Sequence, residues 1–141
     1  MKHQPSESEA HTDPLSEQIK QLRAAYADRV NQISPQGSLE QAGQGKAYAQ
    51  ASDALSLCLA LWPALSGPGN RACLTVVIDH LKQRATIHQQ CAERPPSNPS
   101  RQQDYQTRWQ PLAAACATCL TYIADEIAQT ITRDSQEQER A

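Results

Sequence analysis

The sequence predicts an all-α protein, an up-down four-helix bundle preceded by a disordered N-terminal tail. Three observations lead to this fold class. Apolar residues recur at spacings of three and four over four stretches of the chain, as they do on one face of an α-helix. Segments rich in Pro and Gly separate these stretches, and no run shows the strict apolar-polar alternation typical of strands. Amphipathic helices joined by short loops are expected to pack into a bundle.

The composition sets the kind of core that the bundle has. Hydrophobic residues make up 39% of the 141 residues and aromatic residues only 4%, with no Phe and one Met. A core of Leu, Ile, Val and Ala suits closely packed helices, and a chain of this length needs no disulfide to fold as one domain. We therefore expect a polar, disordered tail at 1–14, one helical domain at 15–134 and a frayed C-terminal tail at 135–141.

The first helix is expected to begin at Leu15, with Asp13 and Pro14 as its N-cap and first position. Its apolar stripe is narrow and consists of Leu15, Ile19, Leu22, Tyr26, Val30 and Ile33. A long connection with Pro and Gly follows, in which Ser38 and Gln41 have the spacing of a capping box. An alternative for so weak a helix is docking on a second copy of the chain, which would make a homodimer.

The second helix carries small residues at its start, and its expected apolar face is Ala47, Ala51, Ala54, Cys58, Leu61, Trp62 and Leu65. The segment PALSGPGN breaks the pattern, and Asn70 is the expected N-cap of the third helix. The third helix has its apolar face at Leu74, Val77, Ile78, Leu81 and Ala85, and PPSNPS ends it. Both loops are short, so neighbouring helices should be antiparallel.

The fourth helix is expected from about Arg101 to Arg133. Its apolar face is Tyr105, Trp109, Leu112, Cys116, Leu120, Ile123, Ile127 and Ile131. Pro111 lies inside this pattern and removes a backbone donor there. Because the stripe continues in phase across Pro111, we expect a kinked helix rather than two helices.

The charges are balanced, with 13 basic and 15 acidic residues interspersed along the chain. This balance argues against the basic stripe of a nucleic-acid-binding protein. DNA binding through Arg71, Lys82, Arg84 and Arg94 of the third helix is the alternative. No signal-like apolar segment and no apolar run of about 18 residues is present. We therefore expect a cytoplasmic protein whose partner is neither nucleic acid nor a membrane.

Five cysteines in a chain without a signal peptide are expected to be reduced thiols. Cys116 and Cys119, in the segment CATC, lie on one side of the fourth helix. Folding the chain back at its loops sets Cys58 level with Cys73, and Cys73 roughly level with Cys119. Four thiols in one layer form a candidate metal site, because four thiolates suit zinc and soft ligands suit copper(I).

Ordinary core packing is the interpretation of these thiols that the composition favours, because unpaired Cys behaves as a small buried apolar residue. A thioredoxin-type redox pair would need a βαβ pattern, which the sequence does not show. Cys73 has a separate interpretation as a reactive thiol, since an N-cap at Asn70 would place it in the first helical turn. An inert flank cysteine is the alternative, and we expect no cofactor.

Other groups give no catalytic pattern. His88 and Cys91 have ligand spacing, but the expected neighbours across the loop are glutamines, so a solvated helix flank explains them better. Asp125 and Glu126 are adjacent and project about 100° apart, which does not suit an acid–base pair. The sequence shows no phosphate loop, nucleophile elbow or diiron motif. We expect that the protein is not an enzyme.

Three residues fall off the main apolar faces of their helices, Tyr48, Tyr122 and Ile87. Such side chains either form a partner interface or cover the edge of the chain's own hydrophobic core. We interpret the chain as a small helical bundle that acts through protein–protein interaction, as a regulatory, adaptor or chaperone-like factor. The alternative function is a thiolate metal-binding bundle built on Cys116 and Cys119.

Overall fold

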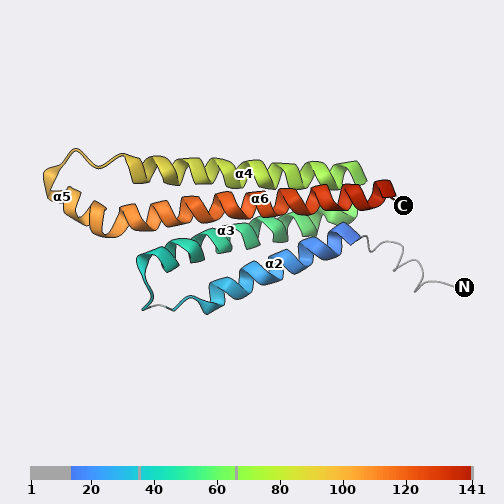
Figure 1. Ribbon diagram of the computed structural model, residues 1–141, viewed down its shortest axis with the longest axis horizontal. Coiled ribbons are helices and arrows are strands. Elements are labelled where there is room, and N and C mark those ends of the chain that lie inside the picture. The colour runs from blue at the N-terminus through green and yellow to red at the C-terminus, as the bar shows by residue number, and fades with distance from the viewer. Residues whose placement is uncertain (1–13, 35, 66, 141) are drawn as a thin grey trace, which may run out of the picture.

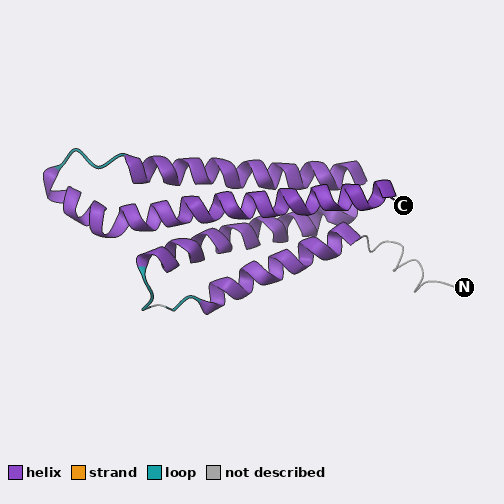
Figure 2. Cartoon of the chain, in the orientation of Figure 1, coloured by secondary structure: helices purple, strands orange, loops and turns teal. Residues whose placement is uncertain are grey.

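The computed structural model describes residues 14–34, 36–65 and 67–140, and within these ranges it contains helices and connections but no strand. Four long helices lie side by side along the long axis of the molecule (Figure 1): α2 (Pro14–Gln32), α3 (Leu39–Leu61), α4 (Gly67–Glu93) and α6 (Gln110–Arg140). Figure 2 shows that most of the described chain is helical. The predicted all-α class with four long helices is confirmed. Apart from Pro14, the predicted N-terminal tail and the Asp13 cap lie outside the described residues.

Helix α6 is the central element. It packs mainly against α4 and α3, whereas α2 lies mainly on α3 and makes a smaller contact with α6. All four helices contribute fully buried apolar side chains to one core: Ile19, Leu55, Leu74, Leu81, Leu120, Ile123 and Ile127. Helix α2 therefore packs within its own chain, and a homodimer through this helix stays a prediction.

Small residues determine how α3 approaches α6. The capping box at the start of α3 is confirmed, since Ser38 and Gln41 exchange two hydrogen bonds of 3.1 Å. A Cβ atom at Gly43 would lie 2.4 Å from the carbonyl oxygen of Leu112, so the two backbones nearly touch there. The row of residues four apart that begins at Gly43 continues through Ala47 and Ala51 and ends on Leu55.

This close contact fixes the rotation of α3 and corrects its predicted face. Leu55, which the predicted face omitted, is fully buried, and Leu61, which it included, is 47% exposed. Helix α3 then ends in a 3₁₀ turn, η1 (Trp62–Ala64), with Pro63 near its start. Trp62 is buried at that end of the core, as predicted.

The predicted start of α4 is wrong. The helix begins at Gly67, so Asn70 lies inside it rather than at its N-cap. Pro68 explains the difference, because a proline is tolerated in the first helical turn, where the missing N–H has no partner to lose. Cys73 is consequently not in the first turn, and the helix-dipole reason for a reactive thiol at this position no longer holds.

The fourth predicted helix is divided differently from the expectation. Helix α5 (Pro99–Asp104) leads into a π-helical turn, η2 (Tyr105–Trp109), and then into α6. The backbone N–H of Gln110 donates to the carbonyl of Tyr105, the i−5 pattern of a π turn, directly before Pro111. The wider turn shifts the phase of the helix, and Trp109 is 58% exposed. The prediction that Trp109 belongs to the core is therefore wrong.

The C-terminal part of α6 also differs from the prediction. Residues 135–140, expected to fray, continue the helix to Arg140. Asp134 is buried there, and Arg71 of α4 donates hydrogen bonds to Asp134 and to Gln138. These contacts hold the last turns of α6 against the start of α4.

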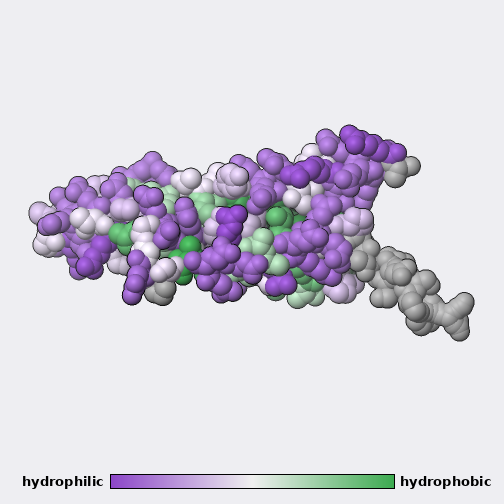
Figure 3. Space-filling model, turned by 60° about the horizontal axis from the view of Figure 1, so that its bottom comes forward, coloured by the Kyte–Doolittle hydropathy of each residue, from purple (hydrophilic) through white to green (hydrophobic). Residues whose placement is uncertain are grey.

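The surface on the side of α2 is largely hydrophilic, with small hydrophobic patches between polar regions (Figure 3). Among the helices of residues 14–34, 36–65 and 67–140, none combines the length and the apolar character needed to cross a membrane.

Candidate functional site

The four candidate thiols lie in two separate places. Cys58 and Cys73 are neighbours across α3 and α4, as predicted from the loop between them. Burial, together with the adjacent Cys73 thiol, raises the pKa of Cys58 to about 12. Cys58 is therefore a protonated, buried thiol at neutral pH, which is neither a nucleophile nor a ready metal ligand.

Cys116 and Cys119 lie elsewhere, with Cys119 beside Tyr48. Tyr48 precedes Cys58 by ten residues of the same helix, about 15 Å along its axis. Burial raises the pKa of Cys116 to about 11 and also raises the pKa of Cys119. In the described part of the chain, no three His, Cys, Asp or Glu residues are grouped so that they could hold a metal ion.

The alignment of α4 with α6 explains why the predicted four-thiol layer does not form. Arg71 contacts Asp134, and the side-chain amide of Gln110 donates to the carbonyl of Ala92 over 3.0 Å. These contacts set Cys73 level with about residue 132, not with Cys119. The chain folds back later than residue 97, because α5 forms the tip of the molecule before α6 returns along α4 (Figure 1).

Tyr48 and Tyr122, two of the predicted interface residues, line the same groove between α3 and α6. Tyr48 is half-buried: its hydroxyl accepts a 2.9 Å hydrogen bond from Arg29, whose guanidinium also lies 5.3 Å from the centre of its ring. Beside it, the Tyr26 hydroxyl donates to Glu126 over 2.5 Å. The Tyr48 side of the groove is thus fixed by contacts among α2, α3 and α6.

Tyr122 is 70% exposed and stands between two grooves. The groove on the α3 side, about 580 Å³ in volume, has a floor formed by Ala114, Ala115 and Thr118. The groove on the α4 side, about 980 Å³, is lined on α6 by Thr118 and Thr121. Ile87, the third predicted interface residue, is 44% exposed but lines neither groove.

A pocket of about 650 Å³ opens at the tip of the molecule, where α4, α5 and η2 meet the start of α3. Its lining combines basic, aromatic and apolar side chains: Lys46, His88, Cys91, Arg94, Pro96, Arg101, Asp104, Tyr105, Trp109, Leu112 and Ala113. The Tyr105 hydroxyl donates to the carbonyl of Cys91 over 2.5 Å and so ties η2 to the end of α4. We call this part of the molecule the open end.

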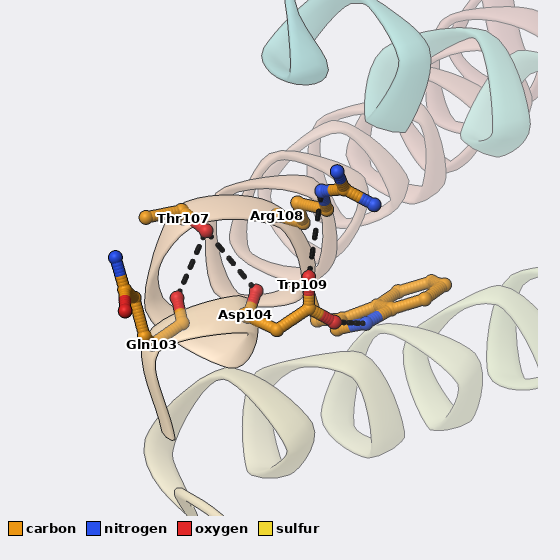
Figure 4. A network of polar contacts seen from close by, with 5 residues as sticks. All are labelled: Gln103, Asp104, Thr107, Arg108 and Trp109. Carbon is orange, nitrogen blue, oxygen red and sulfur yellow. Dashed lines mark hydrogen bonds and ion pairs between the residues drawn. The ribbon is translucent and has the colours of Figure 1, made fainter. Parts of the chain in front are cut away.

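Asp104 is the acidic residue among those lining the pocket, and its carboxylate has partners in the π-helical turn η2 that follows it. One oxygen accepts from the indole N–H of Trp109 over 3.0 Å, and the other lies 3.4 Å from Nε of Arg108 (Figure 4). The hydroxyl of Thr107 donates to the carbonyls of Gln103 and Asp104 in the same turn. These contacts hold the Trp109 ring at the pocket wall.

His88 contributes a ring nitrogen, Nε2, that is buried and makes no hydrogen bond within the described chain. Burial lowers the pKa of His88, and the positive charges of Arg84 and Lys46 lower it further. His88 and Cys91, for which the sequence favours a solvated helix flank over a metal pair, thus line a pocket with three basic side chains, Lys46, Arg94 and Arg101.

The chain matches no family model, no curated protein and no solved structure.

Sequence reasoning missed the open end. The sequence does not mark Lys46, Arg101 and Trp109 as a site, because the overall charge balance hides a local cluster and the spacing of Trp109 predicts a core position. One signal was available: basic residues flank the PPSNPS loop on both sides, at Arg94, Arg101 and Arg108.

Proposed function

We propose that the chain is a non-catalytic, cytoplasmic helical bundle that acts by binding another protein, through the outer face of α6 around Tyr122. The observation that carries this proposal is the exposed Tyr122 ring between two grooves. Tyrosine offers a large, rigid contact area at low cost in conformational entropy, and it is enriched in the residues that dominate binding energy. A tyrosine 70% exposed on a well-packed helix adds little to this chain's own core.

The neighbouring side chains support a helical segment as the bound part of the partner. Ala114, Ala115 and Thr118 are small, so a partner helix can approach the α6 backbone closely beside Tyr122. The rims carry both signs of charge, with Arg29 and Glu40 on one side and Lys82 and Asp125 on the other. A matching partner presents an apolar stripe flanked by mixed charges.

Photo-crosslinking tests this proposal. A benzoylphenylalanine residue replaces Tyr122 in the full chain, and a control chain carries it at Glu137, an exposed position on the same helix. We expect a discrete crosslinked product from position 122 that is absent from position 137. Thr118→Arg in the position-122 chain should abolish the product, because Thr118 lines both grooves and a long charged side chain there obstructs the close approach of a partner helix.

A product of the same mass from both positions would contradict the proposed surface. A product that consists of two copies of this chain would identify the partner as a second copy, which sedimentation of the untagged protein would show independently.

A further inference from the structure

The open end gathers positive charges from three segments of the chain. Lys46 comes from α3, Arg94 follows α4, and Arg101 belongs to α5, yet all three line one pocket. Within residues 14–34, 36–65 and 67–140, none of the three forms an ion pair. Like charges brought together from three segments repel one another, so a ligand of opposite charge would stabilise this arrangement.

The pocket also has an apolar wall. Trp109 is 58% exposed at the pocket, and Leu112 and Ala113 continue the wall along the start of α6. The indole N–H is already satisfied by Asp104, which leaves the ring faces as the part of Trp109 available to a ligand. An exposed aromatic face suits a flat ring or an aliphatic group of a ligand.

The walls are held in place without a ligand. The side-chain amide of Gln110 donates to the carbonyl of Ala92 over 3.0 Å, and that of Gln102 donates to the carbonyl of Pro96 over 3.3 Å. Together with the bond from Tyr105 to Cys91, these contacts fix the α4–α5 hairpin. The volume of about 650 Å³ falls within the range of small-molecule sites, about 300–1,000 Å³.

We propose that this pocket binds a small organic anion that carries phosphate or carboxylate groups next to a flat ring. Lys46, Arg94 and Arg101 bind the anionic groups, and the ring lies against Trp109. His88 also lines the pocket, and the negative charge of a bound anion favours its protonated form. This site is separate from the Tyr122 surface and does not rest on the proposed function.

Isothermal titration calorimetry of the full chain at low salt tests the proposal with four probes. ATP combines a ring with phosphates, and pyrophosphate and adenosine are its two parts. Benzene-1,3,5-tricarboxylate combines a ring with carboxylates. We expect one of the two complete anions to bind, and pyrophosphate and adenosine to bind more weakly than ATP. Preference between ATP and the tricarboxylate distinguishes phosphate from carboxylate, and either preference supports the proposal.

Matched substitutions test whether the pocket is the site. Arg101→Gln should weaken binding of the preferred probe about tenfold, as expected for loss of a charge-assisted hydrogen bond. Trp109→Leu should weaken the ring-bearing probe and leave pyrophosphate unchanged. The control is Arg133→Gln on α6, which removes the same charge from an exposed position outside the pocket and should change affinity less than twofold.

The dependence on pH gives a second readout. His88 faces Lys46 from α3, Arg84 on its own helix, and the other titratable groups of the pocket, which are Cys91, Arg94, Arg101, Asp104 and Tyr105. A bound anion favours protonated His88, so affinity should rise as the pH falls from 7.5 to 6. His88→Gln should remove this dependence while the protein remains folded.

Three results would each overturn the proposal. One is the absence of binding by both complete anions at millimolar concentration. Another is equal weakening by Arg101→Gln and Arg133→Gln, which would reveal only the attraction of a general surface charge. The third is a duplex of 20 base pairs that displaces the small anions at lower concentration, which would assign the positive charges to nucleic acid.

Discussion

The two ends of the bundle use positive charge in opposite ways. Where α4 begins and α6 ends, Arg71 is hydrogen-bonded to the buried Asp134 and to Gln138. We call this the paired end. At the open end, Lys46, Arg94 and Arg101 surround a pocket without an ion pair to any described residue.

Arg71 has a structural role, whereas the cations of the open end are free to bind a ligand. A buried carboxylate with its arginine closes the core and holds the last turns of α6. The cations of the open end cover no buried acid, so the fold does not require them. The following predictions test whether stability belongs to the paired end and binding to the open end, beginning with the largest effect.

The same substitution at the two ends should give very different stabilities. Arg71→Gln leaves the Asp134 carboxylate, with 2% of its side chain exposed, without its partner and should lower the free energy of unfolding by about 3 kcal/mol. Arg101→Gln should change it by less than about 0.5 kcal/mol, as is usual for surface positions. Urea unfolding followed by circular dichroism measures both. Equal losses would contradict the distinction between the ends.

Alanine substitutions at two glycines of α3, Gly43 and Gly45, should affect stability differently. Gly43→Ala should lower the free energy of unfolding by about 2 kcal/mol, because the new Cβ meets the rigid backbone of α6 at Leu112. Gly45→Ala brings a Cβ to 3.1 Å from Cγ1 of Ile33, and Ile33 follows the end of α2, where a shift of a few tenths of an ångström is easier than in the backbone of α6. The gain in helix propensity should then leave the protein at least as stable. Urea unfolding of both variants distinguishes these outcomes, and equal losses would argue against the close approach of α3 and α6.

Acid should test the half-buried His88 of the open end through its effect on stability. The pKa of His88 is lowered in the folded chain, so below its ordinary value of about 6.5 the unfolded chain takes up the proton first. Stability should therefore fall as the pH drops from 7 to 5.5. His88→Gln should show a smaller fall over the same range in thermal unfolding, whereas an unchanged slope would mean that other groups cause it.

Thiol reactivity should also differ between the open end and the core. Cys91 is exposed beside the pocket, whereas Cys58, Cys116 and Cys119 are buried thiols with raised pKa values. An aromatic disulfide reagent at pH 8 should react rapidly with Cys91 and very slowly with the buried three, and Cys91→Ser should abolish the rapid phase. Rapid reaction of Cys116 or Cys119 would contradict their place in the core.

The spacing of apolar residues was enough to predict the helices, because a helix with one buried face carries apolar residues three and four positions apart. Ile19, Leu74, Leu120 and Ile123 were all assigned correctly to the core. The rotation of α3 was not accessible in this way, since Gly43 decides it by letting two backbones meet. Spacing along one helix carries no information about such a contact with another.

The candidate site was predicted less well, because it depends on alignment between helices. The short loop before α4 placed Cys58 beside Cys73 correctly. At the other loop, α5 and the π turn before Pro111 displaced α6 along α4 and rotated Trp109 out of the core. That single displacement separates the predicted four thiols and also builds the pocket at the open end.

An amide chemical-shift map of the ¹⁵N-labelled full chain, titrated with the preferred anion, tests the contrast between the two ends most directly. The account predicts perturbed amides near residue 46 and over residues 88–113, with the amides of residues 57–76 and 130–140 unchanged. Perturbation centred on Arg71 and Asp134, or scattered evenly along the chain, would contradict it.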